Sequence, residues 1–232
     1  MKKVIAKAEV VGEAPSSELV AKRLSGWFPD LAPEILGRLT IYHENLLKFT
    51  KAVNLISANT IKNAEAVHVA DAVMASQILV GSLVPGKPIY DFGSGNGCPG
   101  IILAALYPER SVILVDRDKR KMEFCKHVVS AMNLKNVTCD PLDVEEITDN
   151  SVHNGIARGF APFTKALIMC RKQFVKGGRF LHLKTDGWAN EMAQMPSQVF
   201  THWSPSLIGK YRIPESNADL AIVMTEKLTS EK

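Results

Sequence analysis

The sequence predicts an α/β fold in which a doubly wound, mostly parallel sheet follows a helical cap. The first observation behind this prediction is residues 89–100, Ile-Tyr-Asp-Phe-Gly-Ser-Gly-Asn-Gly-Cys-Pro-Gly, where a short apolar run enters a glycine-rich turn and an apolar helical segment leaves it. The second is the alternation of short apolar runs with helical periodicity beyond this turn, which is typical of β-α-β units. We therefore expect a helical cap over residues 1–85 and a Rossmann-like domain over residues 86–232.

The expected cap rests on helical periodicity. From Ala32 the apolar residues step by three and four and so share one face of a helix; they are Ile35, Leu39, Tyr42, Leu46, Phe49 and Val53. Thr60 has the character of an N-cap for a second helix that runs to about Val80. Its inward positions are Val67, Val73, Met74 and Ile78. Residues 1–16 lack a clear period, so we expect an adaptable N-terminus there.

The expected sheet rests on short runs of apolar residues. After the strand that begins at Ile89, parallel strands are predicted at residues 112–115, 137–139, 151–157 and 179–183. Helices are predicted through Leu106, over residues 118–132 and over residues 163–175, the last ended by Gly177 and Gly178. Two tail strands, residues 199–203 and 220–225, are expected to close the sheet as a hairpin-like pair.

Composition narrows the class of protein. With 232 residues, 46% of them hydrophobic and 22% charged, the chain can form a globular core. No apolar run approaches the roughly 20 residues that span a bilayer, and Lys7 and Glu9 interrupt the apolar start that a signal peptide requires. The four cysteines show no C-x-x-C spacing, which predicts free thiols and no metal site. We expect a cytoplasmic protein whose net charge of +4 permits an RNA partner.

The glycine turn matches two cofactor fingerprints. Residues 95–100 fit G-x-G-x-x-G, which is typical of dinucleotide sites. Reading from Asp91 through Gly93, Gly95 and Gly97 gives D-x-G-x-G-x-G, which resembles motif I of class I S-adenosylmethionine-dependent methyltransferases. The acid favours S-adenosylmethionine, whose ammonium and sulfonium groups are cationic. Asp116, at the end of the second strand, is placed to accept hydrogen bonds from a ribose with either cofactor; alternatively it caps the helix that follows.

Further segments, in the right order and over most of the chain, resemble the bacterial small-subunit (16S) ribosomal RNA guanine-N7 methyltransferases, the RsmG or GidB family. The segment from Asp91 to Ile102 is similar to the family's D-V-G-x-G-x-G-x-P-G-I. The other matches are Val53-Asn54-Leu55, His68-Val-Ala-Asp71, Val115-Asp116 with Arg120-Lys121, Ala157-Arg158-Gly-Phe160-Ala161, and Leu183-Lys184. The chain departs from the family pattern at Ala72, Asp143, Gly159 and Thr185.

The resemblance implies that S-adenosylmethionine donates a methyl group to guanine N7 in small-subunit ribosomal RNA. The implied partner is this RNA or the 30S particle, and we expect the protein to act on it as a monomer. The resemblance places the donor against Gly93 and Cys98, against Asp143 and Val144 after the third strand, and beside Arg158. Guanine N7 carries an exposed lone pair and attacks without prior deprotonation, so catalysis requires in-line positioning and a suitable electric field.

Two basic residues are the candidates for a catalytic role. We expect Arg158 to orient the donor or the target nucleotide, with Phe160 in the pocket wall; the alternative for Arg158 is a plain salt bridge. Lys184 ends the fifth expected strand, where active-site crevices of parallel sheets form. His68 and Asp71, one helical turn apart, either face the crevice or pair at a helix junction.

Two other functions fit parts of the pattern. The turn at residues 95–100 also suits a nucleotide-dependent oxidoreductase, and the same fold suits a non-catalytic RNA-binding assembly module. Candidate phosphate contacts lie in two basic clusters, Arg117, Lys119, Arg120, Lys121 and Lys126, and Arg171, Lys172, Lys176 and Arg179. Binding of S-adenosylmethionine, and not of nicotinamide dinucleotides, would distinguish a methyltransferase from the oxidoreductase. Incorporation of labelled methyl into RNA would distinguish it from the non-catalytic module.

Overall fold

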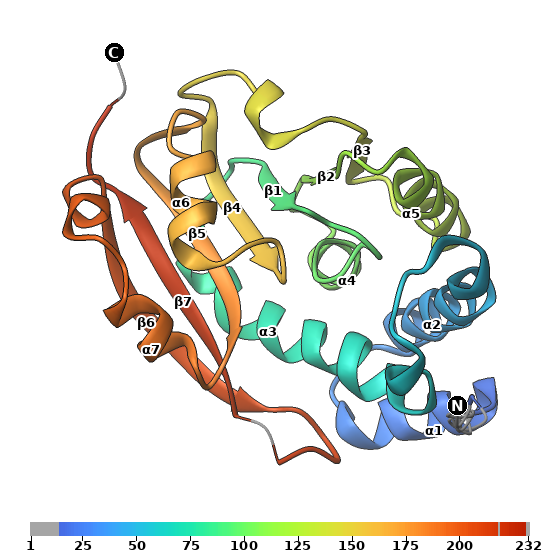
Figure 1. The fold of residues 1–232 in the computed structure, drawn as a ribbon. Coiled ribbons are helices and arrows are strands. Elements are labelled where there is room, and N and C mark those ends of the chain that lie inside the picture. The colour runs from blue at the N-terminus through green and yellow to red at the C-terminus, as the bar shows by residue number, and fades with distance from the viewer. Residues whose placement is uncertain (1–13, 218, 231–232) are drawn as a thin grey trace, which may run out of the picture.

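The computed structural model describes residues 14–217 and 219–230. Of the N-terminal segment expected to be adaptable, residues 1–13 lie outside this part of the chain. Figure 1 shows a central sheet with the N-terminal helices packed along one side and the C-terminal strands at its far edge. The expected α/β fold with N-terminal helices is confirmed.

Within residues 14–217, three α-helices precede the sheet. They are α1 (Ser17–Trp27), α2 (Pro33–Val53) and α3 (Asp71–Leu79). The side chain of Ser16 caps α1 by accepting from the backbone N–H of Leu19. Pro33 opens α2, where its fixed backbone angle suits a first turn, and Asn54 ends that helix in the left-handed conformation.

The predicted helix starting at Thr60 is wrong in its first half. A 3-10 helix spans Ala58–Asn63 and a π-helical turn spans Glu65–Ala70 before α3 begins. The hydroxyl of Thr60 donates to the carbonyl of Ser57, so it does not cap an α-helix. π-Helical turns rotate side chains and carbonyls out of the α-helical register. In this turn the carbonyl of Val67 and the imidazole of His68 face Arg158.

The sheet has seven strands in the order β3-β2-β1-β4-β5-β7-β6. The strands are β1 (Ile89–Phe92), β2 (Val112–Val115), β3 (Val137–Asp140), β4 (Val152–Arg158), β5 (Phe174–Thr185), β6 (Trp203–Arg212) and β7 (Asp219–Lys227). Strands β1 to β5 are parallel, and β7 pairs antiparallel with both β5 and β6. The chain order reverses between β1 and β4, which is the point where doubly wound sheets open a ligand crevice.

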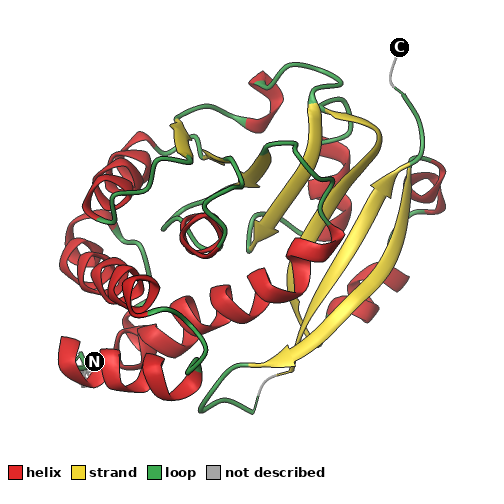
Figure 2. Cartoon of the chain, turned by 180° about the vertical axis from the view of Figure 1, so that it is seen from behind, coloured by secondary structure: helices red, strands yellow, loops and turns green. Residues whose placement is uncertain are grey.

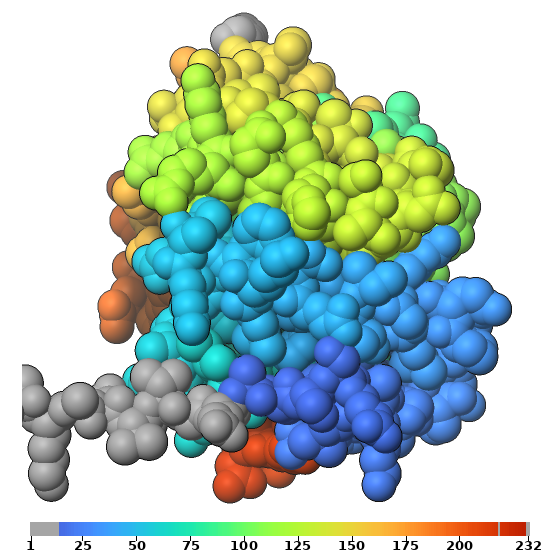
Figure 3. Space-filling model, turned by 90° about the vertical axis from the view of Figure 1, so that its right-hand side faces the viewer, coloured from blue at the N-terminus to red at the C-terminus, as the bar shows by residue number. Residues whose placement is uncertain are grey.

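In the described part of the chain, four further α-helices lie on both sides of the strands (Figure 2). They are α4 (Gly100–Leu106), α5 (Lys119–Ala131), α6 (Phe163–Met169) and α7 (Trp188–Ala193). One buried cluster joins the cap helices to α4 and α5, and a second lies between the sheet and α6. From the side of the cap, α2 (blue) and the α5 region (yellow-green) form one continuous surface (Figure 3).

Two predictions in the C-terminal half need correction. The helix expected over residues 163–175 ends at Met169, and the two glycines lie inside β5. A Cβ at Gly178 would lie 2.9 Å from the carbonyl oxygen of Val152, so this glycine permits a close approach of two strands. The strand expected over residues 199–203 is a 3-10 helix, and the strand proper begins at Trp203, whose indole N–H donates to the carbonyl of Leu167.

Candidate active site

The glycine turn after β1 uses its glycines for different physical reasons. Gly93, Gly95 and Gly97 all have positive φ, at 63°, 55° and 83°. A Cβ at Gly93 would lie 2.6 Å from Cδ2 of Phe160, which belongs to the loop after β4. A Cβ at Gly97 would lie 2.3 Å from Cδ1 of Ile101 in α4. Gly93 therefore lets two loops meet, and Gly97 lets the helix pack under the turn.

Asp91 lies beneath the turn and is almost fully buried. Its Oδ2 accepts from the backbone N–H of Gly100 at 2.9 Å, which ties the end of β1 to the start of α4. Its Oδ1 is buried and has no hydrogen-bond partner within the described residues. Burial raises the pKa of Asp91 from 3.8 to about 7. An unpartnered buried carboxylate oxygen suits a ligand that brings positive charge or an N–H donor.

Asp116 follows β2 and contacts the same turn. Its Oδ2 accepts from the backbone N–H of Gly95 at 2.9 Å, and its Oδ1 accepts from Asp118 N–H at 2.9 Å. The N-cap of α5 is Asp118, whose side chain accepts from the backbone N–H groups of Arg120 and Lys121. Since Asp118 fills the capping role, the position of Asp116 fits the expected ligand contact better than the alternative.

A cleft of about 350 Å³ opens beside the turn, within the roughly 300–1,000 Å³ typical of ligand pockets. Gly93 and Gly95 form its floor, and residues 115–117, 142–144 and 159–161 form its walls. These segments follow strands β1, β2, β3 and β4, so the cleft lies at the carboxyl ends of the parallel strands. Side chains of α5 and α6 complete the lining: Lys121, Lys165 and Met169.

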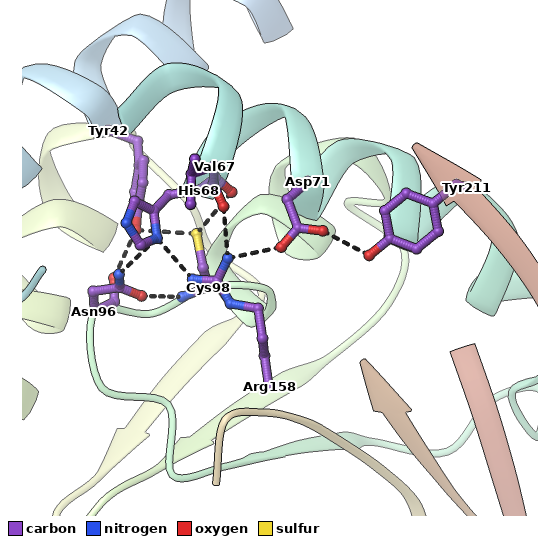
Figure 4. Close-up of polar contacts among 8 residues, drawn as sticks. All are labelled: Tyr42, Val67, His68, Asp71, Asn96, Cys98, Arg158 and Tyr211. Carbon is purple, nitrogen blue, oxygen red and sulfur yellow. Dashed lines mark hydrogen bonds and ion pairs between the residues drawn. The ribbon is translucent and has the colours of Figure 1, made fainter. Parts of the chain in front are cut away.

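Arg158 ends β4 and points toward the helical cap (Figure 4). Its Nη1 donates to Oδ2 of Asp71 at 2.9 Å and to the carbonyl of Val67 at 3.1 Å. Its Nη2 donates to Nδ1 of His68 at 3.0 Å. The phenol of Tyr211, on β6, donates to the other oxygen of Asp71 at 2.6 Å. Both terminal nitrogens of the guanidinium therefore have partners in the cap. The Arg158 side chain is 19% exposed.

His68 is neutral in this arrangement. Burial, and then the Arg158 guanidinium, lower the pKa of His68 to about 3. Its Nδ1 therefore acts as an acceptor, and Asn96 in the glycine turn lies within reach of the same nitrogen at 3.4 Å. The Asn96 side-chain oxygen accepts from the backbone N–H of Cys98 at 3.1 Å. The cap and the turn are thus joined through one imidazole.

A second contact joins the cap to the turn through α2. The Tyr42 hydroxyl donates to the carbonyl of Asn96 at 2.9 Å and accepts from the Cys98 thiol at 3.0 Å. Burial raises the pKa of the Cys98 thiol to about 11, so the thiol stays protonated at neutral pH. Cys98 is 3% exposed and lies behind the turn, away from the cleft lining.

The predicted site residues divide into two groups. Those that line the cleft are Gly93, Gly95, Asp116, Asp143 and Val144. Those outside its lining are Asp91, Gly97, Cys98, Arg158 and Lys184. Lys184 pairs with Glu191 at 2.9 Å, and its ammonium lies 4.2 Å from the centre of the Phe163 ring. Its catalytic role stays a prediction.

Sequence reasoning missed three residues that the fold brings to this region. Lys165 lines the cleft from α6, and Tyr42 and Tyr211 bond to the network behind it. Tyr42 lay in the predicted helix stripe as an apolar position, and nothing in its spacing indicated its hydroxyl contacts. Tyr211 stands 140 positions from Asp71, and no local pattern links the two.

Two kinds of feature are absent from the described residues. They hold no group of three or more histidine, cysteine, aspartate or glutamate side chains that could bind a metal ion. Among their helices, none has both the length and the apolar character to cross a membrane.

Comparison with known proteins places these features in a sequence family. A profile described as "GidB: rRNA small subunit methyltransferase G" matches residues 35–210. The chain is 44% identical, over 92% of its length and 96% of the relative's, to "Ribosomal RNA small subunit methyltransferase G 3" of Bdellovibrio bacteriovorus. It is 30% identical to "Ribosomal RNA small subunit methyltransferase G" of Colwellia psychrerythraea, over 85% of this chain and 91% of that one.

Solved structures with similar folds are more distant in sequence. A tRNA (m1A58) methyltransferase from Aquifex aeolicus superposes with a TM-score of 0.52 at 16% identity, covering 69% of each chain. An S-adenosylmethionine-dependent methyltransferase, described as putative, from Methanococcus maripaludis gives 0.53 at 15% identity, covering 82% of this chain and 93% of that one. At these identities the likeness supports the fold alone.

Proposed function

Because this chain belongs to the rRNA small subunit methyltransferase G family, we propose that it transfers a methyl group from S-adenosylmethionine to guanine N7 in small-subunit ribosomal RNA. The predicted family is thereby confirmed. The observation that carries the proposed site is the cleft at the sheet's reversal point, where Asp116 bonds to the glycine turn and lines the same space. Family membership also sets aside the oxidoreductase alternative.

The residues of the cleft fit a nucleoside that carries positive charge. Asp116 would hold the ribose, since its carboxylate oxygens have lone pairs beyond the backbone bonds they already accept. Val144 is 3% exposed and offers an apolar wall for a base. Asp91 lies outside the lining, and its unpartnered oxygen would supply negative charge beneath the turn when the carboxyl ionises. When bound there, S-adenosylmethionine supplies an electrophilic methyl group on a sulfonium ion.

The protein's own part in the reaction is positioning. A guanine N7 nucleophile has its lone pair available at neutral pH, so the site does not need to remove a proton. The loop at residues 159–161 follows Arg158 directly and forms one wall of the cleft that Asp116 also lines. Phe160, packed against Gly93, gives that wall an aromatic face suited to stacking on a base. We propose that Arg158 orients the donor or the target nucleotide at this wall.

The RNA is proposed to approach over the mouth of the cleft. Arg117, Lys121 and Lys165 line the cleft, and the side chain of Arg117 is 84% exposed. Such cations bind phosphates without reading sequence. We further propose that the protein acts as a monomer in the cytoplasm, with naked RNA or the 30S particle as substrate, and that residues 1–85 and 86–232 are its two domains.

The test is transfer of labelled methyl from S-adenosylmethionine by the purified chain. Small-subunit RNA and 30S particles are offered separately, with large-subunit RNA as the specificity control and Asp116→Ala as the site control. We expect label in N7-methylguanosine with a small-subunit substrate, and strongly reduced label with the variant. RNA binding without any incorporation would instead support a non-catalytic assembly module.

A further inference from the structure

One hydrogen-bonded network links the C-terminal hairpin to the glycine turn (Figure 4). It starts at Tyr211 on β6, passes to Asp71 and Arg158, and reaches Asn96 through His68. The phenol and the guanidinium donate to the two oxygens of the carboxylate. The guanidinium also donates to Nδ1 of His68 at 3.0 Å, and the amide of Asn96 shares the same lone pair at the longer distance of 3.4 Å. These contacts join four elements that are far apart in sequence.

The network holds two parts of the proposed donor site, the loop after β4 and the glycine turn. Arg158 is the last residue of β4, and the next three residues form a wall of the cleft. Asn96 lies in the turn between Gly95, which lines the cleft, and Gly97. A shift of Arg158 relative to Asn96 would therefore change the spacing between the wall and the floor of the cleft.

Stability alone is a weak reason for this arrangement. A buried ion pair costs desolvation that its Coulomb attraction only partly offsets, and apolar side chains of similar volume often hold helices and strands together as well or better. What the ion pair supplies is direction, since both oxygens of Asp71 have separate donors at 2.9 and 2.6 Å. The carboxylate then has a single orientation in which both bonds form.

We propose that Asp71 and Tyr211 are positioning residues for methyl transfer, which fix Arg158 and through it the width of the donor site. Tyr211 thereby gives the C-terminal hairpin a role in a site built from the ends of strands β1 to β4. This inference rests on the proposed function, because it requires the donor to bind in the cleft.

The test is the affinity of Tyr211→Phe for S-adenosylhomocysteine, the demethylated product, measured by titration calorimetry. This variant removes the bond to Asp71 and keeps the ring. Because one hydrogen bond can change an equilibrium by up to about tenfold, we expect donor-site affinity to fall by about tenfold, with the far-UV circular dichroism unchanged. Asp71→Asn, which removes the charge opposite Arg158, is expected to act in the same way.

Thr225→Val is the matched control. Thr225 is fully buried in the sheet, and its hydroxyl lies 3.0 Å from Nε2 of His182 and donates to the carbonyl of Phe180. Its loss should lower the melting temperature and leave product affinity unchanged. The double variant Asp71→Asn, Tyr211→Phe should bind no more weakly than the worse single variant, because both changes act on one bond pair.

The outcomes separate the two proposals. Wild-type binding with an unchanged Tyr211→Phe affinity would overturn the positioning role and leave the proposed function intact. Equal weakening by Thr225→Val would also overturn it, because general destabilisation would then explain the effect. Failure of the wild-type chain to bind S-adenosylhomocysteine would overturn the proposed donor site and this inference together.

Discussion

Replacing Asp91 by asparagine tests the electrostatics of the glycine turn through protein stability. The folded protein holds the Asp91 carboxyl in a buried position that raises its pKa from 3.8 to about 7. A carboxyl whose pKa is higher when folded stabilises the fold while it is protonated. That contribution is complete below pH 4 and is lost as the pH rises toward and past 7.

The size of the effect follows from the two pKa values. Each pKa unit is worth about 1.4 kcal/mol, so the total loss, from well below pH 4 to well above pH 7, is about 4 kcal/mol. About 3 kcal/mol of this loss falls between pH 5 and pH 8. Asparagine keeps the shape of the side chain and an oxygen that accepts from Gly100, but it does not titrate. The variant should therefore gain about 3 kcal/mol relative to the wild type over this range.

The assay is urea denaturation of both proteins at pH 5, 6, 7 and 8, with the difference in unfolding free energy plotted against pH. Taking the difference cancels every group that titrates equally in the two proteins. Product affinity should run the opposite way: in the wild type it should strengthen as Asp91 ionises, and in the variant it should not change with pH. A free-energy difference that is the same at pH 5 and pH 8 would refute the reasoning.

Three further predictions concern the cleft. Gly93→Ala should abolish measurable product binding by calorimetry, because its Cβ would lie 2.6 Å from the Phe160 ring. Gly177→Ala is the control, since Gly177 has a φ of 78° and nothing within 4 Å of an added Cβ. It should lower the unfolding free energy by only the roughly 1–2 kcal/mol of left-handed strain and keep product binding. Asp118→Ala should lower the unfolding free energy by about 1 kcal/mol through the lost helix cap and leave product affinity unchanged. Asp116→Ala should weaken product affinity. The reverse pattern would contradict the assigned roles. Lys165→Ala should reduce the slope of log RNA affinity against log salt concentration, measured by filter binding, by about one. Product affinity should not change. An unchanged slope would show that this lysine does not contact RNA phosphate.

The parts of the site that could be predicted from the sequence are those set by local chemistry. Glycine spacing after a strand reports backbone conformation, so the positions of Gly93, Gly95 and Gly97 at positive φ followed from their order alone. Asp116 was predictable because the end of a strand in a β-α-β unit has a fixed place relative to the first turn. Its hydrogen bond to Gly95 agrees with that placement.

The rest depends on contacts between distant segments. Asp71 and Arg158 are 87 positions apart, and their pairing requires the π-helical turn that the helical periodicity of residues 60–80 did not indicate. The sequence predicts a helix end at Gly177 and Gly178. A glycine pair that ends a helix cannot be distinguished from one that permits close strand pairing when the partner strand is unknown. Cys98 is predicted from the sequence to contact the donor, and its spacing does not indicate that its thiol donates to Tyr42 of the cap; the donor contact stays a prediction.

The most direct test of the central claim is a map of N7-methylguanosine in small-subunit ribosomal RNA. The RNA is compared between cells that carry the gene, cells that lack it, and lacking cells that express Asp116→Ala. The proposed function predicts a guanine that carries the N7-methyl group when the intact protein is present and loses it in both other strains. An identical map in all three would contradict the claim.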